Sequence, residues 1–289
     1  MATMLESVWE RNCIDMSAIV FVSGSNTSAA VALIFFQFFL GSSPQLTIFL
    51  SFLISSFFME KSEVKLIGKW SSPYVMRVKI ALNIKSLQYD NFEETLNPKS
   101  DFLLQSNPVF GKVPVLLHHD KPICESLIIV EYIDETWSTA PSILPSDPYD
   151  RAIARFWGAY IDDKWFPSMK TILTVESEEE RKPYFEMMEE VVWRMEDTFG
   201  KCSKGKPFFG GDRIGFLDIA FGSFLGWLSV IEHRCERKLL VEAKAPSLVK
   251  WAERFAADPA VKGLIPETDK LVQISKALQI KWRAAIGKK

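Results

Sequence analysis

The chain has 289 residues and a formal net charge of −2 at pH 7. Acidic and basic residues are interspersed, and no long basic run occurs, which argues against a polyanionic partner such as nucleic acid. The four cysteines form no CxxC pair and have no metal-ligand spacing with the three histidines, so the sequence predicts neither a disulfide framework nor a metal site.

Residues 1–58 differ in composition from everything that follows. No charged residue occurs between Met16 and Met59, and two apolar runs of about 13 residues each occupy 29–40 and 46–58. Each run is shorter than the roughly 20 residues that span a bilayer, although the two joined could form one kinked span or a hairpin. The flanking sequence lacks the positive start of a secretory signal and the arginines of a transit peptide.

The first strand and helix predicted after this extension meet at Ser72. Residues 64–67 form a short apolar run, and the next apolar residues recur at helical spacing (Val75, Val78, Ala81 and Leu82). Ser72 therefore falls at the helix N-cap and Pro73 at the first helical position. Backbone N–H groups and the helix dipole at such a position stabilise a nearby thiolate or oxyanion. An ordinary capping serine would give the same pattern.

Further elements are predicted up to residue 137, in the order strand, helix, strand, strand, helix. They cover residues 88–93, 102–105, the segment opened by Pro114, a short strand at Ile123, and 126–136. Because Pro114 has no N–H to donate, it must lie at a strand start, an edge or a special turn, and a cis Val113–Pro114 bond fits that position.

Residues 138–148 contain three prolines and three serines and are the natural linker. Downstream, helical patterns cover 149–175, 177–199, 216–231, 246–255 and 269–278. We therefore expect domains at 59–137 and 149–289, and the 231 residues from Met59 onward suffice for two packed domains.

Three segments in this order resemble a known family. They are Ser-Pro-Tyr-Val-Met-Arg from Ser72, the segment 107–114 ending in Gly-Lys-Val-Pro, and the segment 121–126 ending in Cys-Glu-Ser. Together they resemble the glutathione transferases, most closely the plant tau class, and the likeness continues through 144–149 and 208–212. The resemblance implies an α/β thioredoxin-like N-terminal domain followed by an all-α C-terminal domain, the cytosolic glutathione transferase architecture.

The resemblance also implies an activity. Such an enzyme conjugates reduced glutathione to hydrophobic electrophiles, in some cases reduces organic hydroperoxides, needs no cofactor beyond this co-substrate, and works as a cytoplasmic homodimer. Positions 71 and 72 carry serine where thiol-dependent relatives carry a cysteine, and a serine cannot form a mixed disulfide. A non-catalytic carrier of hydrophobic ligands with the same fold is the alternative.

Roles for glutathione binding follow residue by residue from the resemblance. Ser72 would donate a hydrogen bond to the glutathione sulfur, with Ser71 as a competing candidate. Glu125 and Ser126 would hold the γ-glutamyl end, and the backbone of Val113 would pair with the cysteinyl amide. The glycyl carboxylate would bind two lysines, Lys99 and Lys112.

The same resemblance implies an electrophile pocket between the two domains. Its lining is predicted to comprise Tyr74, Phe166, Lys170, Trp227 and Ile274, an apolar wall with one polar position. Ordinary core packing is the alternative for each aromatic residue.

Two other positions receive structural interpretations. Asp218 has Gly215 three residues before it, where relatives often carry a capping Ser or Thr, and is interpreted as a folding determinant beside the turn 210–212. Cys124 is interpreted as a small buried hydrophobic residue.

The extension before Met59 fits none of these roles, and Met59 stands where chains of this family usually begin. We therefore favour a translated upstream region or a misassigned start over a membrane anchor or a targeting segment, so a membrane partner is expected only if the extension is real.

Overall fold

The computed structural model describes residues 63–139 and 141–286, which belong to one compact unit that begins at Ser62. The apolar segment 1–58, its possible membrane span and Met59 lie outside the described residues. Among the helices that the structure describes, none combines the length and apolar character needed to cross a bilayer.

The first part of this unit, here called the small domain, is built around a four-stranded mixed sheet with the order β2-β1-β3-β4. Strand β1 pairs in parallel with β2 and antiparallel with β3, and β3 pairs antiparallel with β4. Its elements are β1 (Val64–Gly68), α4 (Pro73–Ile84), β2 (Asp90–Glu93), α5 (Asp101–Ser106), β3 (Val115–His118), β4 (Lys121–Cys124) and α6 (Ser126–Thr136). This is the predicted thioredoxin-like order.

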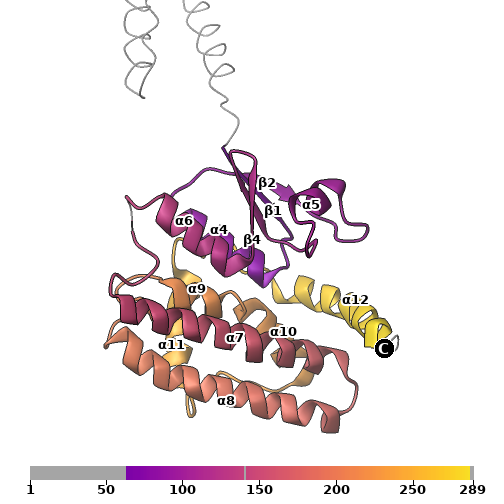
Figure 1. Cartoon of the computed structure of the whole chain (residues 1–289). Helices are drawn as coiled ribbons and strands as arrows, with labels where there is room; N and C mark the ends of the chain where they lie inside the picture. The colour runs from indigo at the N-terminus through magenta and orange to yellow at the C-terminus, as the bar shows by residue number, and fades with distance from the viewer. Residues whose placement is uncertain (1–62, 140, 287–289) are drawn as a thin grey trace, which may run out of the picture. The chain divides into compact units, whose positions relative to one another are not determined.

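The two faces of the sheet bury different side chains, as the alternation along a strand requires. Leu66 and Leu116 belong to the large core that includes α4 and α6, whereas Ile67 and Val115 pack with Leu103 of α5 on the opposite side. Figure 1 shows α4 and α6 together on the side of the sheet that faces the remaining helices. The start of α4 therefore lies close to the helical part of the chain.

The second part, here called the helical domain, consists of helices alone. They are α7 (Pro148–Thr174), α8 (Glu178–Ser203), α9 (Phe216–Gly222), α10 (Leu225–Cys235), α11 (Pro246–Ala257) and α12 (Thr268–Ile286). The long helices α7 and α8 lie side by side (Figure 1). Local capping marks where both begin: Asp147 accepts the N–H of Tyr149 and Asp150, and Ser177 forms a capping box with Glu180.

The prediction of one continuous helix over 216–231 is wrong. The segment is divided into α9 and α10 at Ser223 and Phe224, where the Phe224 N–H donates to the carbonyl of Phe221 three residues back. Gly222 packs so closely that an added Cβ would lie 2.4 Å from the Phe255 ring. The break turns Ser223 and Phe224 toward Arg77 of the small domain, which contacts both.

The linker is held by one buried carboxylate. Asp134 of α6 accepts the N–H groups of Ile143 and Leu144 at 2.8 and 2.9 Å and pairs with Lys85 at 2.8 Å. The carbonyl of Ile143 accepts the N–H of Phe216 at the start of α9. The predicted linker is therefore fastened to both domains.

Asp218 has the structural role expected from the sequence. Its fully buried carboxylate accepts four N–H groups at 2.7–2.9 Å, from Phe209, Gly210, Gly215 and the indole of Trp251. Burial raises the pKa of Asp218 to about 6, against the opposing effect of these donors, so the carboxylate is ionised at pH 7. It joins the turn before α9 to α11.

We predict that Asp218→Asn lowers the free energy of unfolding by on the order of 3 kcal/mol, because the amide offers one acceptor oxygen to four donors. Denaturant unfolding followed by circular dichroism measures the change. Asp212→Asn, in the same turn region but exposed and paired only with Lys206, is the matched control and should change stability by less than about 0.5 kcal/mol. Equal effects of the two substitutions would contradict the assignment.

Candidate active site

Ser72 stands at the start of α4 with a half-buried side chain. Its backbone is extended (φ −85°, ψ 121°), and its hydroxyl oxygen accepts the N–H of Val75 at 3.3 Å. A hydroxyl carries one hydrogen and two lone pairs, so this cap uses an acceptor position and leaves the O–H to donate elsewhere. No acidic residue occupies the first turn of α4, and the positive end of the helix dipole is therefore not offset there.

Ser71 has a different environment. Only 9% of it is exposed, and its carbonyl accepts the indole N–H of Trp227 at 2.7 Å. Trp227, predicted to line the electrophile pocket, is itself 6% exposed. In this structure the tryptophan anchors the loop before α4 to α10.

Arg77 is the central polar residue beneath this helix start. The guanidinium is fully buried, and all five of its N–H donors have acceptors. Nη1 and Nη2 form a bidentate pair with Asp162 at 2.9 and 2.7 Å. The remaining donors reach the hydroxyls of Ser126 and Ser223 and the carbonyl of Ala220, at 3.2, 3.3 and 2.8 Å.

Glu125 and Ser126 begin α6 beside this arginine. Ser126 is 6% exposed and is held by Arg77, whereas Glu125 is exposed and makes no side-chain cap. The backbone of Glu125 has φ 71°, a left-handed value that costs a non-glycine residue of order 1–3 kcal/mol. Such strain persists where the surrounding structure imposes it, and here it falls on the residue that immediately precedes α6.

The loop before β3 presents unpaired backbone. The Val113–Pro114 bond is cis, as predicted. Asn107 closes the loop, since its amide nitrogen donates to the carbonyl of Lys112 at 3.0 Å and its amide oxygen accepts the N–H of Phe110. Neither backbone polar group of Val113 is bonded to another described residue, so both can pair with an extended ligand.

One predicted lysine, Lys112, belongs to this loop, and the other, Lys99, reaches it from before α5. A Cβ placed on Gly111 would lie 3.2 Å from the ammonium nitrogen of Lys99, which therefore reaches the residue before Lys112. Lys112 is exposed, with its ammonium 5.4 Å from the Phe110 ring centroid. The structure thus brings two cations from separate positions in the sequence to one loop.

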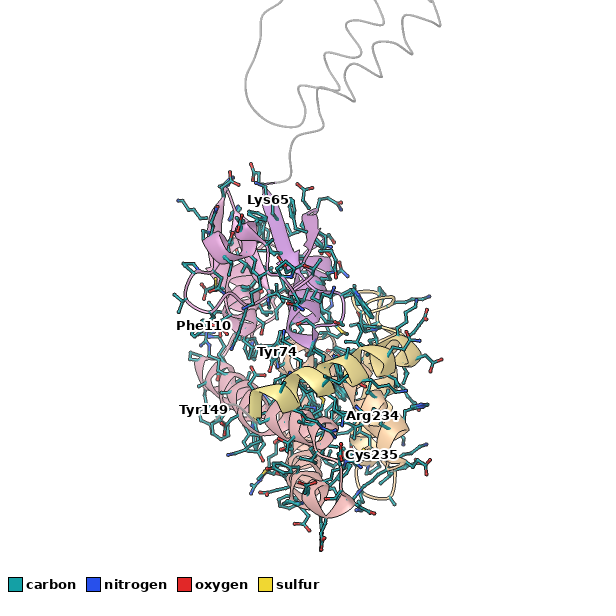
Figure 2. The ribbon with its side chains drawn as sticks, turned by 90° about the vertical axis from the view of Figure 1, so that its right-hand side faces the viewer. Lys65, Tyr74, Phe110, Tyr149, Arg234 and Cys235 are labelled. Carbon is teal, nitrogen blue, oxygen red and sulfur yellow. The ribbon has the colours of Figure 1, made fainter. Side chains whose placement is uncertain are left out.

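An aromatic cluster includes Tyr74, two residues after Ser72. Tyr74 contacts Phe166 of α7 and Phe224 edge-on, with ring centroids 5.3 and 5.7 Å apart. Tyr74 lies where the small domain meets the helices (Figure 2). Burial, followed by the charge of Asp162, raises the pKa of the Tyr74 phenol, which therefore stays protonated. Phe224 was not predicted from the sequence.

The two remaining pocket candidates involve α12. The Lys170 ammonium lies over the ring of Trp282 at 5.4 Å, one helical turn beyond Phe166 on α7. Ile274 is partly buried on α12. Of the five predicted residues, Tyr74 and Phe166 are therefore in direct contact, Lys170 faces the end of α12, and Trp227 is an anchor beneath the site.

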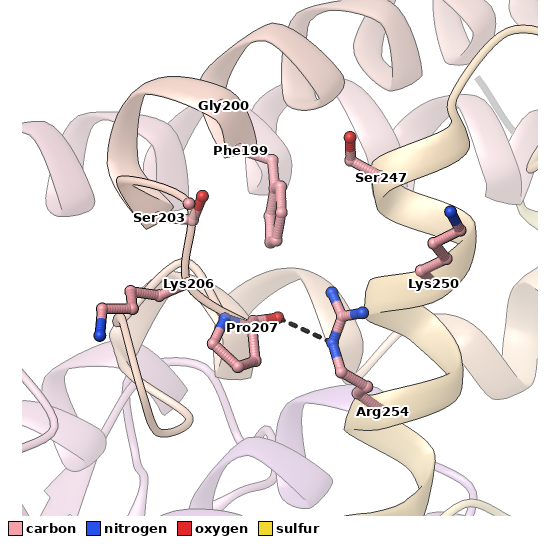
Figure 3. A pocket seen from close by; sticks show the side chains of 9 residues that line it. Phe199, Gly200, Ser203, Lys206, Pro207, Ser247, Lys250 and Arg254 are labelled. Carbon is pink, nitrogen blue, oxygen red and sulfur yellow. Dashed lines mark hydrogen bonds between the residues drawn. The ribbon is translucent and has the colours of Figure 1, made fainter.

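A separate hollow of about 450 Å³ lies in the helical domain between the end of α8 and α11 (Figure 3). Arg254 lines it and donates to the carbonyl of Pro207, with Ser203, Ser247 and Lys250 nearby. None of the predicted glutathione or electrophile residues contributes to its wall, so this hollow is not part of the candidate site.

Comparison with known proteins shows the family of this chain. The family models for the N-terminal and C-terminal domains of glutathione S-transferases match residues 62–135 and 156–259. Glutathione S-transferase U18 of Arabidopsis thaliana is 58% identical over 227 residues, which are 78% of this chain and 100% of that protein. The chain belongs to the glutathione S-transferase family.

Solved structures extend the comparison. A tau class glutathione S-transferase from mango, Mangifera indica, shares 63% identity and a TM-score of 0.73 over 75% of this chain and 99% of its own. Rice GST1, solved in complex with glutathione, shares 36% identity and a TM-score of 0.70 over 76% and 99%. The protein is therefore a tau class glutathione transferase, and the predicted family and fold are confirmed.

Sequence reasoning missed several residues that shape the site of this transferase. Arg77 and its partner Asp162 are the clearest, and a signal was present for both. Arg77 lies four residues before Ala81 on the apolar face of α4, and Asp162 lies four residues after Gly158 and three before Trp165 on the buried face of α7. A charge on each of two buried faces indicates an ion pair.

We predict that Arg77→Ala lowers the free energy of unfolding of the transferase by about 3–5 kcal/mol, because Asp162 is left without its partner. Arg77→Lys should recover only part of this loss, since an ammonium lacks the five-donor fork. Urea unfolding provides the measurement. Lys79→Ala on the same helix is the control, with an expected change within about 0.5 kcal/mol; if Arg77→Ala behaves like this control, the role assigned to Arg77 is wrong.

Proposed function

We propose that this transferase conjugates reduced glutathione to hydrophobic electrophiles by holding the glutathione thiolate at the Ser72 hydroxyl. The observation that supports this best is the free O–H of Ser72, which its capping bond to Val75 leaves available beside the start of α4. Ser71 is the weaker candidate because it is nearly buried.

The Ser72 hydroxyl and the start of α4 can together lower the pKa of the glutathione thiol by the amount that is needed. A free thiol has a pKa of about 8.5, so forming a useful thiolate near neutrality needs a shift of roughly two units, or about 2.7 kcal/mol. A hydrogen bond to a charged acceptor contributes about 1.5–3 kcal/mol, and a helix start about 0.3–1 kcal/mol. One hydroxyl at this position is therefore sufficient.

The rest of the tripeptide would bind along the line from α6 to the loop before β3. Glu125 and Ser126 would meet the γ-glutamyl ammonium and carboxylate, and the unpaired backbone of Val113 would pair with the cysteinyl amide. Lys99, whose ammonium lies close to Gly111, and Lys112, the next residue along the chain, would bind the glycyl carboxylate. Rice GST1, which is 36% identical to this chain, was solved in complex with glutathione, and this supports a glutathione site in the same fold.

The acceptor would enter beside the aromatic cluster of Tyr74, Phe166 and Phe224, with Lys170 and Ile274 in the surrounding wall and Trp227 as an anchor beneath it. An apolar site next to a fixed thiolate favours conjugation by proximity. The same thiolate can reduce an organic hydroperoxide to its alcohol and water while two glutathione molecules are oxidised to the disulfide. A cytoplasmic location, where glutathione is kept reduced, would supply the co-substrate.

We predict that Ser72→Ala lowers turnover with an aryl halide by about 10- to 1000-fold, as expected when one preorganised donor to an anion is lost. The pKa of enzyme-bound glutathione, followed by thiolate absorbance, should rise toward its free value. Ser71→Ala is the matched control and should retain most activity. Wild-type turnover in Ser72→Ala together with inactive Ser71→Ala would transfer the role to Ser71.

Substitutions at the ends of the tripeptide should have a different kinetic effect. We predict that Lys112→Ala and Ser126→Ala raise the KM for glutathione more than they lower kcat, because both groups act away from the sulfur. Steady-state kinetics with glutathione varied at saturating acceptor separates the two parameters. An unchanged KM in both variants would contradict the proposed orientation of glutathione. It would not bear on the role of Ser72 in holding the thiolate, which the serine variants test separately.

Two exposed apolar patches support the homodimer implied by the resemblance. The first lies on the small domain and comprises Phe92, Phe102, Leu104, Val109 and Phe110; the second lies along α6 and α7 and comprises Ile128, Tyr149 and Phe156. Phe110 and Tyr149 appear on the same side of the molecule in Figure 2. A two-fold axis between the patches would bury both pairs at once, the small domain of one subunit against the helical domain of the other.

We predict that the protein is a dimer by light scattering at micromolar concentration and that Phe110→Ala weakens the dimer at least about 10-fold, as removal of a central aromatic anchor does. Analytical ultracentrifugation over a dilution series measures the dissociation constant. Ile280→Ala, which removes an apolar side chain from α12 that is 73% exposed against 55% for Phe110, should leave the dissociation constant unchanged. A monomeric wild-type protein would refute the proposal.

A further inference from the structure

The turn between β3 and β4 brings together two of the three histidines of the chain. His118 ends β3, and His119 and Asp120 form the turn with φ 48° and 61°. Successive side chains of a strand point to opposite faces. The left-handed backbone of His119 overcomes this alternation, and the two imidazole rings stack with centroids 4.3 Å apart.

Glu63, immediately before β1, supplies a third group at the same place. Its carbonyl accepts the N–H of His119 at 3.0 Å, and its carboxylate lies 3.6 Å from Nε2 of His119. One potential ligand atom from each of Glu63, His118 and His119 lies within 4.8 Å of the others. Within the described part of the chain, no other group of three His, Cys, Asp or Glu side chains comes this close.

The surroundings of His118 are those of a histidine that can bind a metal. Its Nδ1 is hydrogen-bonded to the hydroxyl of Tyr132 at 2.7 Å, and its ring packs on Trp137 with centroids 4.8 Å apart. Metal-binding histidines characteristically engage their second nitrogen in such a bond, which sets the ring orientation. Nε2 is then the nitrogen that is left to take a metal.

We propose that Glu63, His118 and His119 form a surface site for a divalent transition metal of the zinc class. Two imidazole nitrogens and one carboxylate oxygen suit Zn²⁺, Ni²⁺ and Cu²⁺, with water in the remaining positions. The nearby Asp120 carboxylate is bonded to Lys65 and is not counted as a ligand.

The geometry needs only a modest adjustment. With bonds of about 2.1 Å and tetrahedral angles, ligand atoms around zinc lie about 3.4 Å apart. Because the ligand atoms all lie within 4.8 Å of one another, none has to move closer to another by more than about 1.4 Å. The side chains of His119 and Glu63 are 59% and 61% exposed, so both can rotate toward the ring of His118, which Tyr132 and Trp137 hold in place.

A metal here would join the start of β1 to the β3–β4 turn. Lys65, whose ammonium contacts Asp120 of this turn, and Tyr74 lie at opposite ends of the small domain in Figure 2. The site is therefore independent of glutathione chemistry. Because the unfolded chain does not hold the three groups together, metal binding should stabilise the folded state.

Isothermal titration of untagged, chelator-treated full-length protein with zinc chloride tests the proposal, together with the Tm with and without zinc. We expect the wild-type protein to bind one equivalent of zinc and to show a zinc-dependent rise in Tm. In His119→Asn and Glu63→Gln the zinc affinity should be at least about 10-fold weaker, and the rise in Tm should be lost. Asparagine tolerates the left-handed backbone at 119, so the turn is kept. Tyr132→Phe should weaken zinc about 10-fold or more through the orientation of His118.

His233→Ala, which removes the remaining histidine, is the matched control and should leave the zinc affinity unchanged. Zinc bound by cysteine thiols would survive in both His119→Asn and Glu63→Gln. Zinc binding that persists at wild-type affinity in these two variants, or the absence of any zinc-dependent change in heat or Tm in the wild-type protein, would overturn the proposal. Glutathione conjugation should be equal in wild-type and His119→Asn protein.

Discussion

The architecture depends most on the buried guanidinium of Arg77. Burying a charge is costly unless it is paired and every donor is satisfied. Arg77 meets this condition only when Ser126, Asp162, Ala220 and Ser223 are all in place, at sequence separations of 49 to 146 residues. Arg77 therefore ties the small domain to the helical domain, because its donors are satisfied only when both domains are in place.

This constraint extends to the site. Arg77 lies one helical turn beyond Pro73, so fixing it also fixes the helix start and the direction of the Ser72 hydroxyl. The same guanidinium lies 5.0 Å from the ring centroid of Tyr74 and holds Ser126 at the start of α6. The groups assigned to the sulfur, the γ-glutamyl end and the acceptor are thereby positioned by one cation.

Two buried carboxylates stabilise the irregular segments of the fold by accepting hydrogen bonds from backbone N–H groups. Asp134 fastens the linker and pairs with Lys85, and Asp218 fastens the turn before α9 to α11. Both satisfy donors of irregular backbone that would otherwise be buried without partners. The linker and the turn before α9 are consequently each held by a buried carboxylate.

The sequence by itself determined the features that depend on neighbouring residues. The cap at Ser72, the cis bond before Pro114 and the helix over 126–136 follow from local backbone chemistry and periodicity, and short motifs sufficed to identify the family. The tertiary structure alone decided the division of 216–231, the partners of Arg77 and the meeting of His118 and His119 with Glu63. Each of these depends on contacts between groups distant in the sequence, or on a turn that brings consecutive side chains to the same face of the sheet. Local sequence patterns do not predict such contacts.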